Sequence, residues 1–193
     1  MKEICFATNN PNKIAEIQAM MPEHIKIISL KDIGCEVELP ETQDTLEGNS
    51  LQKAQYVFDH FQVACFADDT GLEVHALGGE PGVYSARYAG PQRDSHDNME
   101  KLLVELNGKE DRSAQFRTVI TLLNEDGQQQ FEGIAKGEII LELSGEQGFG
   151  YDPIFKPENH QVTFAEMDKH QKNKISHRGR AVQKLIEYIK EHY

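Results

Sequence analysis

Two adjacent carboxylates, Asp68 and Asp69, are the residues of this chain best suited to do chemistry. They follow an apolar run, VACFA at 63–67, and precede Thr70 and Gly71. Like charges this close raise each other's pKa or require a cation. Mg²⁺ takes one or two carboxylates and keeps its other positions for water and phosphate oxygens. The pair therefore predicts a metal site at the end of a buried strand, with one carboxylate on the ion and the other orienting or deprotonating a water. The alternative is a turn with two solvated aspartates.

Two polar segments upstream offer groups that bind anions and metals. The first, ATNNPNK at 7–13, joins a predicted strand to a predicted helix, where backbone N–H groups and the helix dipole favour an anion. It lacks the glycines of a Walker loop, so an ordinary turn with an asparagine cap is the favoured alternative for this segment alone. The second, 40–54, places Glu41 in a loop and Glu47 and Lys53 in a helix. Glu47 is expected to complement the helix dipole, whereas Glu41 is free to reach elsewhere.

Two later segments have the residues to recognise a base. In GFGYDPIF at 148–155, an aromatic ring between glycines offers a face to a base, and Asp152 is placed to accept a hydrogen bond from a ring N–H. An equal alternative is that Phe149 and Tyr151 pack on the core. The segment at 172–181 holds the densest basic cluster of the chain: Lys172, Lys174, His177, Arg178 and Arg180. Ser176 is the predicted cap of the last helix, so cations crowd a positive helix end, which an anion or a carbonyl-rich ligand would explain.

The elements that must position these residues alternate between helix and strand patterns. Apolar residues at helical spacing predict helices over 12–21, 45–60, 96–106 and 179–192. Strand-like apolar runs lie at 3–8, 25–29, 61–67, 115–123 and 130–142. Thr45 is the predicted cap of the second helix, and Glu125-Asp126-Gly127 predicts a hairpin between the last two strands. The mixture predicts an α/β or α+β fold with a mixed sheet.

Composition bounds the class of protein. The 193 residues are enough for one domain, which we expect to span 1–193. The net charge of −12 argues against a nucleic-acid-binding surface, and no apolar run reaches the roughly 18 residues of a membrane span. We therefore expect the protein to bind neither nucleic acid nor a membrane. The three cysteines form no CxxC motif and indicate reduced thiols, with Cys5 and Cys65 filling the core. With no signal-peptide pattern, the expected compartment is the cytoplasm.

Taken in order, these motifs resemble those of the inosine triphosphate pyrophosphatase family, the dITP/XTP pyrophosphatases. The pattern T-x-N-x-x-K is met by Thr8, Asn10 and Lys13. The later motifs are PET at 40–42, ADDTG at 67–71, GGEPGVYSAR at 78–87, GFGYDP at 148–153 and SHRGRA at 176–181. Each motif is weak alone, but the ordered set spans the whole chain. Thr70 stands where serine is usual and keeps the hydroxyl. Arg180 stands where lysine is common and keeps the positive charge.

The resemblance implies an enzyme that hydrolyses ITP, dITP and XTP to the monophosphate and pyrophosphate, and so removes damaged purines from the nucleotide pool. The implied cofactor is Mg²⁺, with Mn²⁺ as a substitute. The implied fold is mixed α/β, with two lobes around a long central mixed β-sheet, flanking helices and an active-site cleft between the lobes. The implied assembly is a homodimer.

The resemblance also assigns roles to residues. Asp69 is the implied proton acceptor and a metal ligand, Glu41 is the second metal ligand, and Asp68 and Arg87 support the site. The residues implied to hold phosphates are Thr8, Asn9, Asn10, Asn12, Lys13, Lys53 and Thr70. Those implied to hold the base are Phe149, Gly150, Tyr151, Asp152, Lys172, His177 and Arg178. A 6-keto purine presents an acceptor at O6 and a donor at N1, which basic donors and the Asp152 acceptor would match, whereas adenine would face unpaired donors.

Three rival functions remain open from the sequence. A Maf-like nucleotide pyrophosphatase has a similar architecture, but the motifs at 148–153 and 176–181 argue against it. A nucleotide sensor would bind a triphosphate without cleaving it, and would not need the metal-binding carboxylates Asp69 and Glu41. A structural scaffold leaves the basic cluster at the last helix unexplained.

Overall fold

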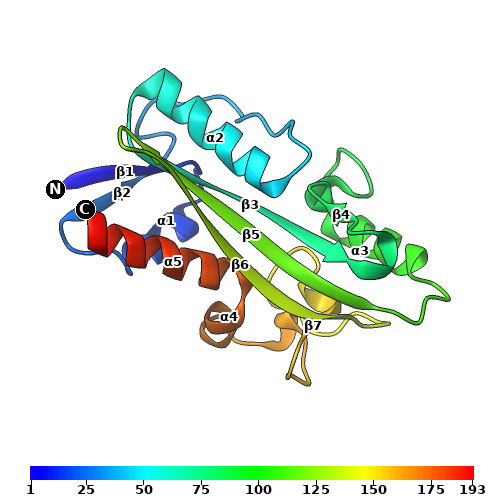
Figure 1. The fold of residues 1–193 in the computed structure, drawn as a ribbon. Coiled ribbons are helices and arrows are strands. Elements are labelled where there is room, and N and C mark those ends of the chain that lie inside the picture. Colours follow the sequence, from blue (N-terminus) through cyan, green and yellow to red (C-terminus); the bar gives the residue numbers. More distant parts are fainter. The chain divides into compact units, whose positions relative to one another are not determined.

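The computed structural model describes the backbone of residues 1–193 and the side chains of all of them except Asn12 and Glu16. The fold is mixed α/β, as expected (Figure 1). Its helices are α1 (Pro11–Gln18), α2 (Leu46–Phe61), α3 (Ser95–Glu105), α4 (Lys169–Ile175) and α5 (His177–His192). Its strands are β1 (Lys2–Phe6), β2 (Ile25–Ile28), β3 (Cys65–Val74), β4 (Pro81–Gly82), β5 (Ser113–Asn124), β6 (Gly127–Ile139) and β7 (Phe155–Pro157).

The strands form one mixed sheet in the order β2-β1-β3-β5-β6-β7, with β4 paired to β3. β1 runs parallel to both β2 and β3, whereas β4 and β7 run antiparallel to their neighbours. β5 and β6 are neighbours joined only by Glu125 and Asp126, a connection short enough for antiparallel strands alone. The predicted hairpin and mixed sheet are therefore confirmed.

The chain forms two compact units. The first comprises Met1–Asp69, Val119–Glu132 and Ala181–Tyr193, and the second comprises Thr70–Thr118 and Gly133–Arg180. Strands β3, β5 and β6 contribute residues to both units. Neither unit is continuous in sequence, so neither corresponds to a segment that could be excised from the chain.

The first unit has apolar cores on both faces of its strands, as the period-2 alternation of β residues requires. Ile4 and Phe6 of β1 belong to the core that includes α5, whereas Cys5 between them belongs to the core that includes α2. Figure 1 shows α2 and α5 on opposite faces of these strands. Helix α2 packs against buried residues on one face of the strands. This packing fixes the position of α2 and of Lys53, which it carries.

The second unit is built around a cluster of aromatic rings. Phe116 of β5 meets Phe155 of β7 edge-on, with ring centroids 4.7 Å apart, and Phe164 stacks beside them. Leu102 of α3 and Tyr151 are buried in the same cluster. Because the loop that carries Tyr151 also carries Phe149 and Asp152, this core fixes the segment that the sequence analysis assigns to base recognition.

Most predicted elements are confirmed within a few residues. Thr45 caps α2, and its side chain accepts a hydrogen bond from the Gly48 backbone N–H. Ser176 caps α5, and its hydroxyl accepts from the Gly179 N–H at 3.1 Å. Helix α4 was not predicted. Among the described residues, no helix combines the length and the apolar character that crossing a bilayer requires.

The interpretation of Asp68-Asp69 as a strand end is wrong. β3 continues through both carboxylates to Val74. The continuation is stabilised by pairing with β4, where Leu72 faces Gly82, and by Leu72 and Val74, which are fully buried. The two aspartates therefore lie in the middle of a rigid strand, with their side chains directed to opposite faces.

Candidate active site

The first unit brings two predicted carboxylates together around a buried ammonium. The Lys53 Nζ atom donates to Glu41 Oε1 at 2.5 Å and lies 3.5 Å from Asp69 Oδ1. Only 9% of Lys53 is exposed. Glu41 comes from the loop before α2, Lys53 from α2 and Asp69 from β3. Residues far apart in sequence thus converge on one charged centre.

The loop that carries Glu41 is fastened to α2 by amide side chains. Gln52 accepts from the Thr42 N–H at 2.9 Å and donates to the Thr42 hydroxyl at 2.8 Å. Asn49 accepts from the Gln43 N–H at 2.9 Å. These contacts hold Glu41 over Lys53.

Sequence reasoning missed Asn49 and Gln52. A signal for Asn49 was available, because it shares the buried stripe of α2 with Leu46, Lys53 and Val57. A polar residue on such a stripe needs a buried partner.

Asp69 is the carboxylate whose surroundings are most unusual. Burial raises the pKa of Asp69, the charge of Lys53 lowers it, and the charge of Glu41 raises it again, so that the pKa lies above its usual value. Its Oδ2 atom is buried and has no hydrogen-bond partner among the described residues. A buried carboxylate oxygen without a donor, beside the oxygens of Glu41, fits the ligand set that a hard divalent cation prefers.

Asp68 lies near a second lysine. Its Oδ2 atom is 3.7 Å from the Lys13 Nζ atom, and 31% of the Lys13 side chain is exposed. Lys13 is in α1, directly after the polar turn of the predicted phosphate segment. This turn and the acidic strand are therefore neighbours in the first unit.

The polar turn is held by its own side chains. Thr8 Oγ1 accepts from the Asn10 N–H at 3.2 Å, Asn10 Oδ1 accepts from the Lys13 N–H at 3.3 Å, and Asn9 Oδ1 accepts from the Lys31 N–H at 2.9 Å. Asn10 thus caps α1, as the alternative of an ordinary capped turn expects. The side chain of Asn12 lies outside the described part of the structure. Phosphate binding by this turn stays a prediction.

The second unit assembles the residues assigned to the base. Asp152 is 2% exposed, and its Oδ2 atom accepts from the Phe149 N–H at 2.8 Å and from Lys172 Nζ at 2.5 Å. The Lys172 ammonium lies 4.7 Å from the centre of the Phe149 ring, and the Arg178 guanidinium lies 5.7 Å from it. Phe149 as a whole is 65% exposed. An exposed aromatic face held beside two cations is suited to a flat, electron-rich ligand.

Two further residues of this group are anchored in the core. His177 is buried and stacks on Phe116, with ring centroids 4.6 Å apart. Tyr151 is buried, and its hydroxyl donates to the Ser85 carbonyl at 2.7 Å. The Tyr151 side chain therefore supports the loop from the core side, while Phe149 lies on the solvent side. Thr70, assigned to phosphate, shares a 2.7 Å hydrogen bond with Thr118.

Comparison with known proteins decides the family. Residues 4–188 match the Ham1 family along almost the entire chain. The chain belongs to the Ham1 family. This confirms the resemblance drawn from the motifs.

Ham1 relatives agree in sequence and in fold. A protein of Flavobacterium johnsoniae named dITP/XTP pyrophosphatase is 60% identical over 187 residues, covering 97% of each chain. One of the same name from Flavobacterium psychrophilum is 57% identical, covering 97% of this chain and 99% of the relative. The solved structure of the Staphylococcus aureus Ham1 protein matches with a TM-score of 0.95 and 39% identity over the full length of both chains. A HAM1 protein from Coxiella burnetii matches with a TM-score of 0.94 and 38% identity, over 99% of this chain and 100% of that one.

The segment GGEPGVYSAR at 78–87, one of the motifs that carried the resemblance, folds into a tight loop. Ser85 Oγ accepts from the Leu72 N–H at 2.8 Å and donates to the Gly82 carbonyl at 2.6 Å. The Arg87 guanidinium lies 5.3 Å from the centre of the Tyr84 ring. The supporting role expected of Arg87 stays a prediction.

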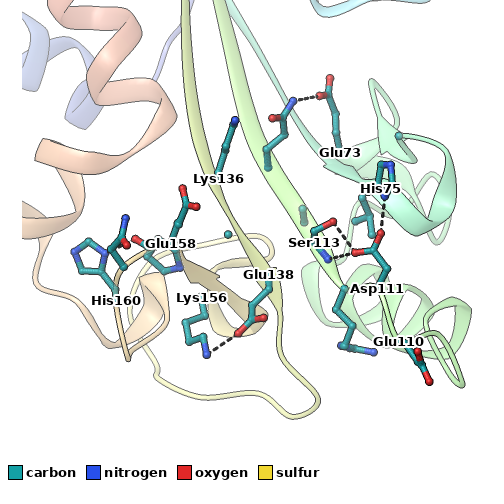
Figure 2. Close-up of a pocket in the computed structure, with 18 of the residues that line it drawn as sticks. Glu73, His75, Glu110, Asp111, Ser113, Lys136, Glu138, Lys156, Glu158 and His160 are labelled. Atoms are coloured by element: carbon teal, nitrogen blue, oxygen red, sulfur yellow. Dashed lines mark hydrogen bonds and ion pairs between the residues drawn. The ribbon is translucent and has the colours of Figure 1, made fainter.

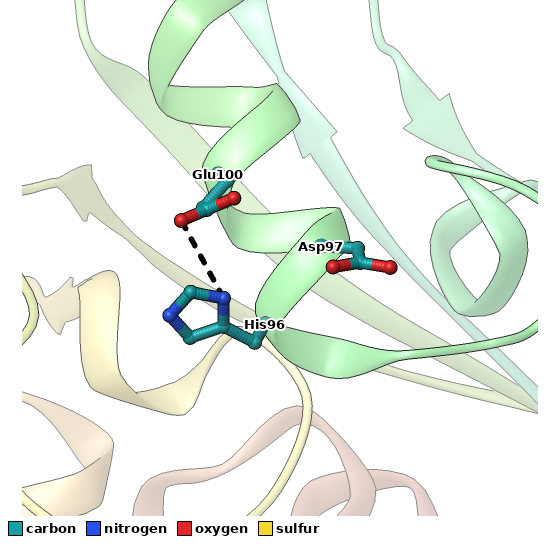
Figure 3. A group of neighbouring side chains, drawn as sticks. All are labelled: His96, Asp97 and Glu100. Atoms are coloured by element: carbon teal, nitrogen blue, oxygen red, sulfur yellow. Dashed lines mark ion pairs between the residues drawn. The ribbon is translucent and has the colours of Figure 1, made fainter.

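Two other polar features of this Ham1 chain lie in the second unit, apart from the predicted residues. A pocket of about 1040 Å³ opens on the polar face of its strands, and the lining side chains include the hydrogen-bonded His75 and Asp111 (Figure 2). His96, Asp97 and Glu100 cluster at the start of α3, all exposed (Figure 3). Neither contains Glu41 or Asp69, and exposed acidic groups of this kind are common without an ion.

Proposed function

We propose that this chain is a Mg²⁺-dependent nucleoside triphosphate pyrophosphatase that hydrolyses ITP, dITP and XTP to the monophosphate and pyrophosphate. The observation that carries the proposal is the cluster of Glu41, Lys53 and Asp69, with a buried carboxylate oxygen left without a donor. Ham1 relatives named dITP/XTP pyrophosphatase support the choice of substrate. The role that follows is removal of damaged purine nucleotides before polymerases use them.

In this proposal Glu41 and Asp69 hold the metal ion, and Asp69 accepts the proton of the attacking water. In the ligand-free protein the pKa of Asp69 lies above its usual value, chiefly because the carboxylate is buried. When bound, Mg²⁺ supplies charge neutralisation for the phosphates and activates water. The water oxygen bonds to the α-phosphorus, the bond from that phosphorus to the bridging oxygen breaks, and pyrophosphate leaves. Asp68 supports this centre, while Thr8, Asn9, Asn10, Asn12, Lys13, Lys53 and Thr70 are proposed to donate to the phosphates.

The base is proposed to be recognised by the residues gathered in the second unit. Lys172, His177 and Arg178 supply donors for O6, Asp152 supplies an acceptor for N1–H, and Phe149 stacks on the ring. Gly150 and Tyr151 shape the loop, and Arg87 braces the neighbouring segment. Adenine would leave buried donors facing its amino group, which is costly.

The remaining expectations belong to the same proposal. We propose that residues 1–193 work as one domain, that two copies form a homodimer, and that Mn²⁺ replaces Mg²⁺ in activity. A cytoplasmic location is supported by three buried free thiols at Cys5, Cys35 and Cys65.

The test is one assay with Mg²⁺ in which ITP, GTP and ATP are compared and pyrophosphate is scored separately from orthophosphate. We expect pyrophosphate from ITP and little product from GTP or ATP. The matched control is Asp69→Asn, which should fold as the parent does and lose at least about 10²-fold in turnover, the usual contribution of a general base. Orthophosphate as sole product would replace the proposal with a phosphatase, and tight ITP binding without any product would replace it with a sensor. Full turnover by Asp69→Asn would remove Asp69 from its role.

A further inference from the structure

The ammonium of Lys53 occupies the position between the two carboxylates assigned to the metal. It lies 2.5 Å from Glu41 Oε1 and 3.5 Å from Asp69 Oδ1, and its side chain is 11% exposed. Glu41 is held there by the loop contacts of Asn49 and Gln52. The described structure thus shows a built cation site whose cation is a side chain of the protein.

The charges around Lys53 explain why it stays there without a ligand. A lysine side chain is ordinarily a cation at neutral pH, and this one has two carboxylate partners, Glu41 Oε1 at 2.5 Å and Asp69 Oδ1 at 3.5 Å. Without that cation, Glu41 and Asp69 would lose the ammonium that they share. Separating a buried charge from its partner is strongly unfavourable, so the ligand-free cluster keeps its lysine.

A divalent ion and this ammonium are like charges that the same two carboxylates would hold. Mg²⁺ binds carboxylate oxygens at about 2.1 Å, so an ion on Asp69 Oδ2 and Glu41 would lie close to an ammonium that stays on Asp69 Oδ1 and Glu41 Oε1, and the two cations would repel each other. An ion that arrives alone would also leave the buried Lys53 charge without an acceptor. A triphosphate supplies new acceptor oxygens, and the four-carbon stem of lysine lets its ammonium move while the stem stays packed.

From this competition we propose that Lys53 is a positioning residue that neutralises Glu41 and Asp69 in the ligand-free protein and moves to the triphosphate when the divalent ion takes its place. The inference rests on the proposed function, because it assigns the metal to the same two carboxylates. Its consequence is positive linkage, in which phosphate and metal each promote binding of the other. In the absence of nucleotide, the Lys53 ammonium keeps the affinity of the protein for the divalent ion low.

The test measures Mn²⁺ affinity without nucleotide, by the electron paramagnetic resonance signal of free Mn²⁺, in the wild-type protein and in Lys53→Met. Methionine keeps most of the stem and removes the charge. We expect Mn²⁺ to bind Lys53→Met at least about tenfold more tightly, within the usual range of coupling between sites. In EDTA the variant should melt at a lower temperature than wild type, and Mn²⁺ should restore more of its stability.

Two controls separate displacement from a general charge effect. Lys13→Met removes the same charge near Asp68, and should change Mn²⁺ affinity far less, because the Lys13 ammonium lies 3.7 Å from Asp68, which is not assigned to the metal. Adding Asp69→Asn to Lys53→Met should abolish the gain. If Lys53→Met does not fold, Lys53→Gln is scored in the same titration.

Equal Mn²⁺ affinity in wild type and the Lys53 variants, or an equal gain in Lys13→Met, would overturn the inference. Neither result would touch the proposed function, which is decided by pyrophosphate release from ITP. Conversely, absence of ITP hydrolysis in the wild type would overturn the function whatever the titration shows.

Discussion

At the scale of single residues, Gly148 decides whether the Phe149 loop holds its shape. A Cβ atom at Gly148 would lie 2.1 Å from Asp152 Oδ2, the oxygen that binds the Phe149 N–H and Lys172. Its φ of +82° is also one that other residues avoid. Gly148→Ala must therefore displace Asp152 and with it both partners. We expect KM for ITP to rise at least about tenfold, equivalent to 1.4 kcal/mol of binding, with kcat little changed.

Gly150→Ala is the matched control for this prediction. Gly150 lies in the same loop at a φ of +62°, but a Cβ there would have no heavy atom of the described structure within 4 Å. Both variants carry the backbone cost of a left-handed residue, about 1–2 kcal/mol, and only Gly148→Ala adds the collision. Steady-state kinetics with ITP compare them. Equal KM values in the two variants would show that the Asp152 contacts do not shape the substrate site.

At the scale of elements, β3 shows what the sequence could and could not predict. The apolar run before Asp68 correctly predicted a buried strand. Two charges followed by Thr70 and Gly71 look locally like a turn, and only the pairing of Leu72 with Gly82 of β4 and the burial of Leu72 and Val74 keep the strand going. Pairing between strands cannot be inferred from local composition, so the end of the strand was misplaced, and the chemistry assigned to the carboxylates stays a prediction.

Helix α2 gives a similar lesson. Its start at Thr45 was predictable from cap chemistry, which is local. The contact of Lys53 with Glu41 and Asp69 depends on how the preceding loop folds back, through Asn49 and Gln52, and no spacing rule predicts it. Motif order therefore predicted the residues of the candidate site, while the partner that each one contacts became clear only in the structure.

Two buried cysteines on the paired strands β1 and β3 should make the stability of the protein depend on pH. Cys5 and Cys65 face each other in register and are fully buried. Burial, together with the neighbouring thiols, raises the pKa of each from 9.0 to about 12. The pKa of each thiol is higher in the folded protein than in the unfolded protein. The contribution of each thiol to the free energy of unfolding is therefore fully present below pH 9 and is lost as the pH rises from 9 towards 12. Through these two thiols, the free energy of unfolding should fall by about 2 kcal/mol between pH 9 and pH 10.

Urea unfolding at pH 8, 9 and 10 checks this, with Cys5→Ala/Cys65→Ala as the control. The double variant starts less stable, because it loses buried atoms, but its stability should fall less steeply above pH 9. Thiol titration of the native protein at pH 8 should leave both cysteines unreacted until urea is added. Parallel slopes for the two proteins would show that these thiols do not titrate differently on folding.

At the scale of the whole molecule, the two compact units are expected to unfold together. The chain passes between them at 69/70, 118/119, 132/133 and 180/181, and β3, β5 and β6 contribute to both. A strand that loses its hydrogen bonds in one unit loses the support of its continuation in the other. The sequence predicted one domain over 1–193, and cooperative unfolding is the physical property that such a domain should have.

Leu185→Ala in α5 tests this cooperativity. Leu185 is fully buried in the core of the first unit, so the change should cost about 2–5 kcal/mol. We expect one calorimetric transition, shifted to lower temperature, and faster hydrogen exchange of the most protected amides in both units by the same factor. Leu102→Ala, fully buried in α3 of the second unit, is the reciprocal variant and should have the same global effect. If each variant instead accelerates exchange only in its own unit, the units are separate folding domains. Shared strands that transmit stability would not allow one unit to open while the other stays protected.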